Sequence, residues 1–433
     1  MSASRLAITP EVPFRMNPFR LSFLLAVISG VVSLCFSAHT ACAGLPATMP
    51  EVQKRLAIIE KQLPVLSRSA FAAAENAIRH PTARINTPYQ GEPSFAEELI
   101  YRAGSLAIAF PTDDQTATSH DYVLISVRSW EGQNKLKDKD KVATLIPQYR
   151  SRGWKVVLFA SAAGKPAGLV VDDFLDNGAP SGGKEHGRIN ILANVTLGWM
   201  WCCEYAGGMS HHGKFPAVLY SVSMPGALAY DKPLQTARGR LTVFPCAKPI
   251  AAQEMGGVYL KRVKKLADDL STERISKQID AAAQLVAERM NSGRTVGITG
   301  TGHMILYEFN KDMLAPWKPF DAAGQSATAF KKHLKPGELV VWIGDVGVTS
   351  PVEDFSKRIV EAELQLISSS IRDPHWSKGD PPLLAHIDQC WERPDAEVPI
   401  PIFPHKMGPV SAQAAGLIMR MLDDAVASRL KKK

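Results

Sequence analysis

The chain has 433 residues, 45% of them hydrophobic and 8% aromatic, which is enough apolar material for two ordinary buried cores. This composition excludes an intrinsically disordered or fibrous protein. The formal net charge of +8 is spread along the chain in mixed runs such as residues 137–141. No basic face is therefore predicted, and nucleic acid is not expected as a partner.

The first element in chain order has the pattern of an export signal. Three arginines precede an uncharged apolar stretch at residues 21–38, and Ala41, Cys42 and Ala43 follow it as a small-residue cleavage site. We expect a secretory signal peptide over residues 1–43 and a periplasmic or extracellular mature protein. Membrane anchoring by residues 21–38 is the alternative, because the stretch reaches the lower length limit for crossing a bilayer.

The first half of the mature chain predicts a parallel α/β unit. Two strands flank a polar helical segment, and strand, helix, strand at this spacing implies a parallel sheet. Pro64 should kink or split the first helix. The expected strands and apolar runs are residues 122–127, 155–160 and 168–171, and the expected helices are residues 51–80, 97–109, 139–152 and 189–206.

The second half repeats this order, which suggests tandem copies of one α/β unit. A charged helix at residues 259–273 connects the copies, so the expected domains are residues 51–250 and 257–433. The expected strands are residues 295–299, 339–343, 364–368, 385–388 and 397–400, and the expected helices are residues 276–290, 304–314, 351–361 and 410–427.

A glycine turn in the second half is the first candidate binding feature. The strand at residues 295–299 runs into Gly300-Thr301-Gly302-His303 and then into the helix at residues 304–314. Unpaired backbone N–H groups and the helix dipole point at such a turn, so it suits a phosphate or carboxylate ligand. A plain tight turn is the alternative, because glycine pairs of this spacing are frequent by chance.

Several short motifs near the C-terminus occur in a distinctive order. Ile387-Asp388-Gln389-Cys390 precedes Asp395-Ala396-Glu397-Val398, and Lys406-Met407-Gly408-Pro409-Val410-Ser411 then opens the last helix. With Asn291-Ser292-Gly293-Arg294 before the glycine turn, this order resembles the SIS (sugar isomerase) phosphosugar-binding family. Residues 96–104 look like the helix that follows that turn in stand-alone bacterial members. The resemblance covers most of residues 50–430.

The resemblance implies a fold and a class of ligand. The implied fold is two flavodoxin-like three-layer α/β/α domains with parallel sheets. The implied partner is a small-molecule sugar derivative, a sugar phosphate or a related anionic carbohydrate, without a cofactor. Aldose–ketose isomerisation is one implied activity, and an exported non-catalytic module for sugar sensing or protein interaction is the alternative. A homodimer stays open.

In the family a Ser-x-Ser-Gly turn usually holds the phosphate, so the resemblance assigns ligand-binding hydroxyls. Ser126 and Ser129 keep part of this turn in the first half, and Arg128 between them suits paired hydrogen bonds to phosphate or carboxylate. A surface salt bridge is the alternative for Arg128. The equivalent stretch of the second half contains Asp345, which would repel a phosphate. We therefore expect one site, or sites assembled across the halves, with further ligand-binding groups at Gly300, Thr301, Gly302, Thr349, Ser350 and Ser411.

Isomerisation needs a base and groups that stabilise an enediolate and open the sugar ring. His303, Glu308, His405 and Lys406 are the catalytic candidates, because loops at switch points and helix N-termini are where α/β sheets bind ligands. Glu97 and Glu98 are their counterparts in the first half. The alternative is that the glutamates complement helix dipoles and that the loop histidines are solvent-exposed.

Four cysteines follow the leader: Cys202, Cys203, Cys246 and Cys390. Three disulfide pairings are open in an oxidising compartment, and buried free thiols are equally consistent with the apolar segment around Cys202 and Cys203. Together with His211 and His212, the cysteines match no standard zinc spacing. No metal site is expected.

Overall fold

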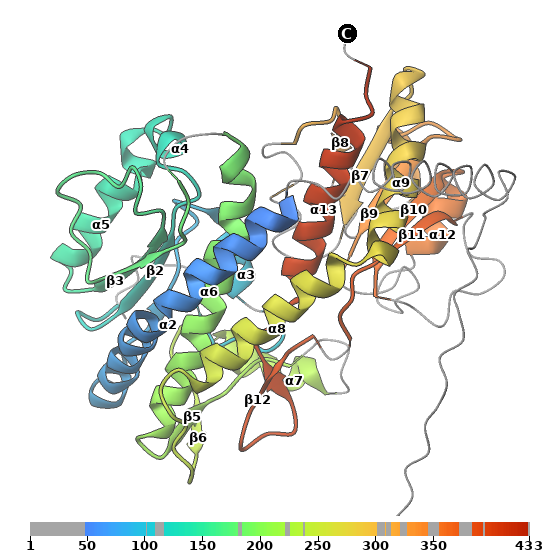
Figure 1. Cartoon of the computed structure of the whole chain (residues 1–433). Coiled ribbons are helices and arrows are strands. Elements are labelled where there is room, and N and C mark those ends of the chain that lie inside the picture. Colours follow the sequence, from blue (N-terminus) through green and yellow to red (C-terminus); the bar gives the residue numbers. More distant parts are fainter. Residues whose placement is uncertain are drawn as a thin grey trace, which may run out of the picture. The chain divides into compact units, whose positions relative to one another are not determined.

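Two parallel sheets organise the chain between its helices (Figure 1). Residues 46–433 belong to one compact unit, and the domain boundary near residue 250 stays a prediction. The computed structural model describes residues 48–433 except 101, 109–116, 181–183, 221–225, 237–238, 301–307, 309–312, 321–326, 345–354, 372–382, 393–394 and 432–433. The expected signal peptide thus lies outside the described residues.

The first sheet is parallel throughout and is covered on both faces. Along β2, Leu124 joins the main core under the long helices, whereas Val123 and Ile125 pack with α5 (Val142–Ser151) on the other face. Strands buried on both faces need apolar residues at successive positions, and β2 has them. The strands, in the order of the sheet, are β1 (Ile85–Asn86), β2 (Tyr122–Ser126), β3 (Lys155–Ala160) and β4 (Asp173–Asp176).

The second sheet has the order β11-β10-β9-β7-β8, all parallel. In chain order this is 2-1-3-4-5, the flavodoxin-like arrangement, and its switch point lies between β7 and β9. Gly300 ends β7 there and pairs with Ile343. The strands are β7 (Val296–Gly300), β8 (Lys318–Pro319), β9 (Leu339–Ile343), β10 (Gln365–Ser370) and β11 (Leu383–Asp388).

Helices cover both faces of the second sheet as well. Val341 of β9 joins the main core with α9 (Glu273–Asn291) and α13 (Ser411–Ala427), while Val340 and Trp342 pack with α11 (Ala327–His333) and α12 (Phe355–Glu361). Both sheets are therefore the middle layer of an α/β/α arrangement, which confirms the expected fold class.

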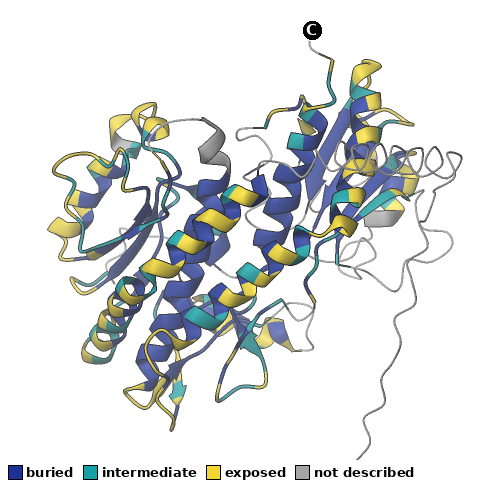
Figure 2. Cartoon of the chain, viewed as in Figure 1, coloured by how far each residue is buried: buried dark blue, intermediate teal, exposed yellow. Residues whose placement is uncertain are grey.

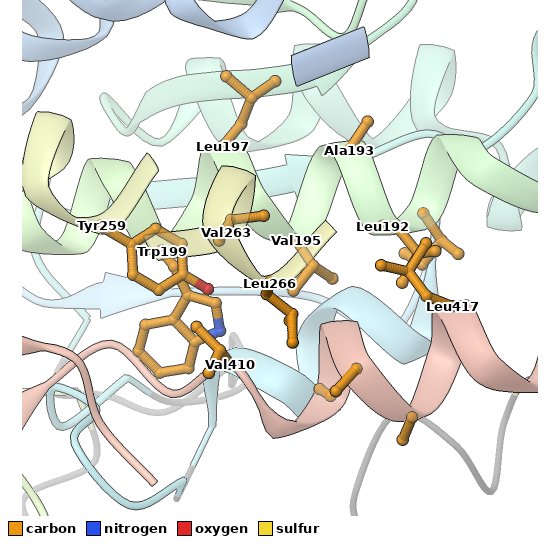
Figure 3. Packing of buried hydrophobic residues seen from close by; sticks show 14 of the residues in the cluster. Leu192, Ala193, Val195, Leu197, Trp199, Tyr259, Val263, Leu266, Val410 and Leu417 are labelled. Carbon is orange, nitrogen blue, oxygen red and sulfur yellow. The ribbon is translucent and has the colours of Figure 1, made fainter. Parts of the chain in front are cut away.

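The long helix α6 (Lys184–Ser210) is buried on all sides over residues 189–210 (Figure 2). It packs against the amphipathic helices α2 (Thr48–Arg79) and α8 (Glu254–Leu270), and α13 also contacts it. Side chains of α6, α8 and α13 meet in one apolar cluster that includes Trp199 (Figure 3). A helix without a polar face has to be enclosed in this way.

Two expectations about local structure were wrong. Pro64 does not split the first helix: it lies inside an uninterrupted α2, on its exposed side, where water can donate to the carbonyl oxygen that proline, lacking an N–H, cannot reach with a hydrogen bond. The helix expected at residues 97–109 is α3 (Pro93–Leu99), because the backbone is extended at Ile100 and turns at Gly104 with φ +76°. The apolar run at residues 168–171 precedes β4, which begins at Asp173, and Gly168 adopts φ +79° at its start.

The remaining elements are short and connect the larger ones. Of the helix expected at residues 304–314, only Glu308, Met313 and Leu314 lie within the described residues. Over the described part of the chain, no helix combines the length and apolarity needed to cross a bilayer. The short elements are α4 (Trp130–Asn134), the 3-10 helix Asp138–Asp140, β5 (Lys214–Pro216), α7 (Ala227–Thr236), β6 (Val243–Pro245), β12 (Val398–Pro399) and β13 (Lys406–Met407).

Candidate functional site

The hydroxyls expected to hold phosphate lie at the carboxyl end of β2. Ser126 is the last residue of this strand, and Ser129 follows it. Ser126 is buried, and its hydroxyl accepts a hydrogen bond of 2.8 Å from the Asn194 amide of α6. Ser129 caps α4 by accepting from the backbone N–H of Gly132 at 3.3 Å. Ser129 is half-buried and therefore offers its hydroxyl at the surface, whereas Ser126 is engaged in the core.

Arg128 and Glu308, two of the predicted site residues, meet in a buried ion-pair cluster. The Arg128 guanidinium binds Glu308 Oε1, and its Nε lies 3.0 Å from Glu92 Oε2. Arg420 of α13 donates to Glu308 Oε2 at 2.7 Å. Arg128 is 8% exposed and Glu308 and Arg420 are 1% exposed, so these charges are neutralised inside the protein.

The start of α3 completes this cluster. Glu92 is the N-cap of the helix and accepts from the backbone N–H of Ser94 at 3.4 Å. The Ser94 hydroxyl donates to Glu308 Oε1 at 2.5 Å, and the Asn190 amide of α6 donates to the Arg128 carbonyl oxygen at 2.7 Å. The cluster thus ties the segment after β2 to the segment after β7.

Sequence reasoning missed three members of the cluster: Arg420, Glu92 and Ser94. A signal existed for Arg420, because it is the one charge in the apolar run at residues 417–422, and such a charge needs a buried partner. Glu92 precedes Pro93, which favours the first turn of a helix, so its capping role was also visible. Nothing in the sequence identified Glu308 as their common partner.

Ser411 opens α13, but groups of the chain itself occupy that helix N-terminus. Asp395 accepts from the backbone N–H groups of Val410 and Ser411 at 3.0 and 3.1 Å and also binds the Ser411 hydroxyl. Arg102 donates to Ser411 Oγ at 2.6 Å and pairs with Asp395 at 3.2 Å. The Asp395 carboxylate therefore takes the place that an anionic ligand would have at this end of α13.

The first-half glutamates are placed differently. Glu98 is fully buried and forms an ion pair with Arg102 at 3.4 Å, so it belongs to the same structural group as Asp395. Glu97 is half-buried on α3.

His405 and Lys406 lie in two different environments. The His405 ring packs edge-on against Tyr220 with centroids 4.1 Å apart, and it stacks on Phe403 at 4.9 Å. Burial lowers the pKa of His405 below its ordinary value of 6.5. Lys406 lies on β13 and lines a groove with Arg262 of α8 and Glu397. Neither residue contacts the Arg128–Glu308 cluster through any hydrogen bond or ion pair that the structure describes.

Gly300 ends β7 at the switch point, where its backbone pairs with Ile343. The other groups expected around the second-half turn lie outside the described residues: Thr301, Gly302, His303, Thr349 and Ser350.

The usual metal-binding side chains are not clustered in the part of the chain that the structure describes. Among its residues, no group of three or more His, Cys, Asp or Glu side chains is arranged to hold a metal ion. Burial raises the pKa of both the Cys202 and the Cys203 thiol, and Cys246 and Cys390 are also free thiols. His211 Nε2 lies 2.7 Å from the Ile250 carbonyl oxygen.

No known family profile matches the sequence, and no curated protein sequence matches it. The structure is similar to the C-terminal domain of glucosamine-fructose-6-phosphate aminotransferase from Francisella tularensis, with 7% identity, a TM-score of 0.43 and coverage of 86% of this chain and 93% of that one. It is also similar to a candidate sugar-binding protein from Salmonella typhimurium LT2 (11% identity, TM-score 0.49, 89% and 99% coverage).

A third similar structure is a candidate phosphosugar isomerase from Silicibacter pomeroyi DSS-3, with 10% identity, a TM-score of 0.45 and coverage of 89% and 97%. At such identities the likeness concerns the architecture alone, and it assigns no role to any residue. The sheets and their covering helices define an α/β/α protein with flavodoxin-like strand order in its second sheet.

Proposed function

We propose that this chain binds a sugar phosphate or a related anionic carbohydrate derivative where the segments after β2 and β7 meet. One observation carries the proposal: Arg128, which follows β2, is ion-paired with Glu308, which follows β7. Parallel sheets bind ligands beyond the carboxyl ends of their strands, and a 2-1-3-4-5 sheet does so at its switch point. The pair thus joins the binding ends of the two sheets.

The ligand-binding groups in this proposal are the Ser129 hydroxyl, the backbone N–H groups around it and the glycine turn that the sequence predicts at residues 300–303. Hydroxyls and converging N–H groups suit a phosphate oxygen. Arg128 has a supporting role, because carboxylates on both sides neutralise its charge. It holds the segment after β2 in place instead of gripping the anion itself.

Glu308 likewise acts as a positioning residue in this proposal. Its Oε1 accepts from Ser94 and Arg128 and its Oε2 accepts from Arg420, so both carboxylate oxygens are occupied. A general base needs an oxygen within hydrogen-bond reach of the substrate proton. Binding is therefore the proposed function. If isomerisation follows binding, the general base in this proposal is His303 and not Glu308.

A thermal-shift experiment tests the proposal with three phosphorylated probes and their unphosphorylated counterparts: glucose 6-phosphate, fructose 6-phosphate and glucosamine 6-phosphate. A ligand at about 100 times its Kd adds about 2.7 kcal/mol to the free energy of unfolding, which raises the melting temperature measurably. We expect a shift with a phosphorylated sugar and a smaller one without the phosphate. No shift with any of the six compounds refutes the proposal.

The variant Ser129→Gly sharpens this test. Glycine is a tolerable N-cap, so the substitution removes the hydroxyl at a cost of a few tenths of a kcal/mol. We expect the ligand-induced shift to fall while the melting temperature without ligand stays nearly constant. Ser292→Ala, at an exposed helix end in the second half, is the matched control and should leave the shift unchanged.

The second candidate function is an exported, non-catalytic interaction module. The observation that favours it is that Arg128, Glu308 and Ser411 are all engaged by groups of the chain itself. In that case no sugar shifts the melting temperature. N-terminal sequencing of the mature protein tests the proposed signal cleavage. A chain that still begins at Met1 would exclude cleavage after Ala43.

A further inference from the structure

A polar groove lies apart from the Arg128–Glu308 cluster. It consists of two hollows of about 680 and about 330 Å³ that share Asp269, Cys390, Trp391 and Glu392 in their walls. The end of α8, the start of α9 and the segment between β11 and β12 form these walls. The volumes are those of small-molecule sites.

Most charges of the groove are paired within its walls. Arg274 bonds Asp388 at 2.7 Å, Lys265 bonds Asp269 at 2.6 Å, and Arg262 lies 3.5 Å from Glu397. Among the described residues of the lining, four cations balance four carboxylates. They are Arg262, Lys265, Arg274 and Lys406 with Asp269, Asp388, Glu392 and Glu397.

Among the described lining residues, Lys406 and Glu392 are the two charges that stay outside these pairs. Neither side chain forms a hydrogen bond, or an ion pair within 4.0 Å, with any residue that the structure describes. An ammonium group is a hydrogen-bond donor and a carboxylate is an acceptor, so the groove offers one of each to a ligand.

The surroundings of Lys406 disfavour a phosphate. Both Lys406 and Glu392 act electrostatically on Glu397, so the ammonium group lies in the field of the Glu397 carboxylate. A phosphate bound to Lys406 would meet the like charges of Glu392 and Glu397. An anionic ligand is therefore a poor match for this groove.

An apolar ligand is an equally poor match. Three apolar side chains of the lining are turned into the core: Trp391 is 7% exposed, and Leu266 and Val410 are almost completely buried. A ligand therefore meets donors and acceptors together with limited apolar surface, to which the half-buried Ile371 contributes. A sugar hydroxyl both donates and accepts, so an uncharged ligand rich in hydroxyls matches these walls without leaving a charge unpaired.

We propose that this groove binds a neutral, hydroxyl-rich carbohydrate, with Lys406 donating to its hydroxyl groups and Glu392 accepting from them. The groove shares no residue with the cluster after β2 and β7. The inference therefore does not rest on the anionic sugar site, and either can fail without the other.

Cys390 provides a reporter for the test. It lines both hollows and is half-buried, whereas Cys202, Cys203 and Cys246 are buried. Alkylation of the full-length protein with iodoacetamide at alkaline pH, followed by mass spectrometry of peptides, gives the labelling rate at Cys390. The probes are chitotetraose, cellotetraose and maltotetraose.

We expect one of these tetrasaccharides to slow the labelling of Cys390 about tenfold when its concentration is about ten times its Kd. Lys406→Met and Glu392→Gln should each abolish this protection without changing the labelling rate in the absence of sugar. Lys135→Met, at the exposed lysine that follows α4, is the matched control and should keep the protection.

Three outcomes would overturn the inference. The first is no protection by any tetrasaccharide at the highest soluble concentration. The second is protection that Lys406→Met and Glu392→Gln leave intact, because the sugar would then bind elsewhere. The third is equal protection by the polar peptide Gly-Ser-Gly-Ser, which would make the groove a peptide site. Thermal shifts of the Lys406→Met variant with sugar phosphates test the anionic sugar site separately, because that site does not include Lys406.

Discussion

Replacing Arg420 by methionine tests whether the buried cluster holds the two sheets together. Arg420 is on α13, is 1% exposed and donates to Glu308 at 2.7 Å. Methionine keeps most of the side-chain length and adapts to irregular packing, so the substitution chiefly removes the charge. Glu308 then keeps Arg128 and Ser94 as partners, but Arg128 is also ion-paired with Glu92.

The expected cost follows from this charge count. Among the described residues, the cluster pairs two arginines with two glutamates, and Arg420→Met removes one of these two positive charges. Removing one partner of a buried ion pair costs about 3–5 kcal/mol. That is a large fraction of a typical free energy of unfolding of about 5–15 kcal/mol. The double variant Glu308→Gln with Arg420→Met removes both charges and should recover at least half of the loss.

Urea unfolding followed by the fluorescence of the 8 tryptophans measures these effects. Arg429→Met is the matched control, because Arg429 follows the same helix and pairs with Asp280 at the surface, where an ion pair contributes about 0–1 kcal/mol. The reasoning fails if Arg420→Met costs no more than Arg429→Met, or if the double variant is less stable than Arg420→Met alone.

Further predictions concern glycine, histidine and cysteine. In chemical unfolding, Gly408→Ala should lower the free energy of unfolding more than Gly293→Ala does, by about 1–3 kcal/mol. Both glycines have positive φ, but only at Gly408 would the added Cβ clash with the ring of Tyr259, at 2.8 Å. Equal losses for the two variants would argue against the tight contact. Burial lowers the pKa of His405, so the folded state prefers the neutral ring and stability should fall as the pH drops below 6.5. Between neutral pH and pH 5, the melting temperature should fall less for His405→Gln than for the unsubstituted protein. Parallel curves of melting temperature against pH for the two proteins would contradict this. Burial and the nearby Asp388 raise the pKa of Cys390 to about 11, so alkylation should speed up as the pH rises, and mass spectrometry should still find Cys390 modified before the three buried cysteines.

Much of the fold could be predicted because strands and long helices have local signals. The β2, β3 and β9 runs are apolar at successive positions, as expected for strands covered on both faces. The predicted local structure was wrong where a tertiary contact determines the backbone conformation. The backbone at Gly104 approaches Gly408 so closely that a Cβ would lie 3.1 Å from the Gly408 nitrogen, and a helix continuing beyond Ile100 does not make that approach.

The candidate site could be predicted only in part. Strand ends identified Ser126, Arg128 and Ser129 as neighbours, but local patterns do not reveal pairs between residues far apart in the chain. Arg128 and Glu308 are 180 positions apart, and only the folded chain places them in contact. The same limit applies to Ser411, whose partner Arg102 is 309 positions away.

The enclosed helix α6 has a consequence for how the protein is made. Its partners come from across the chain: α2 is synthesised before it, α8 follows it, and α13 is completed only near residue 427. Until then, the side of α6 that α13 covers stays exposed, and exposed apolar surface promotes aggregation. A nascent chain released without its last helix should therefore associate with itself or depend on a chaperone, and truncation before Ser411 should yield insoluble protein.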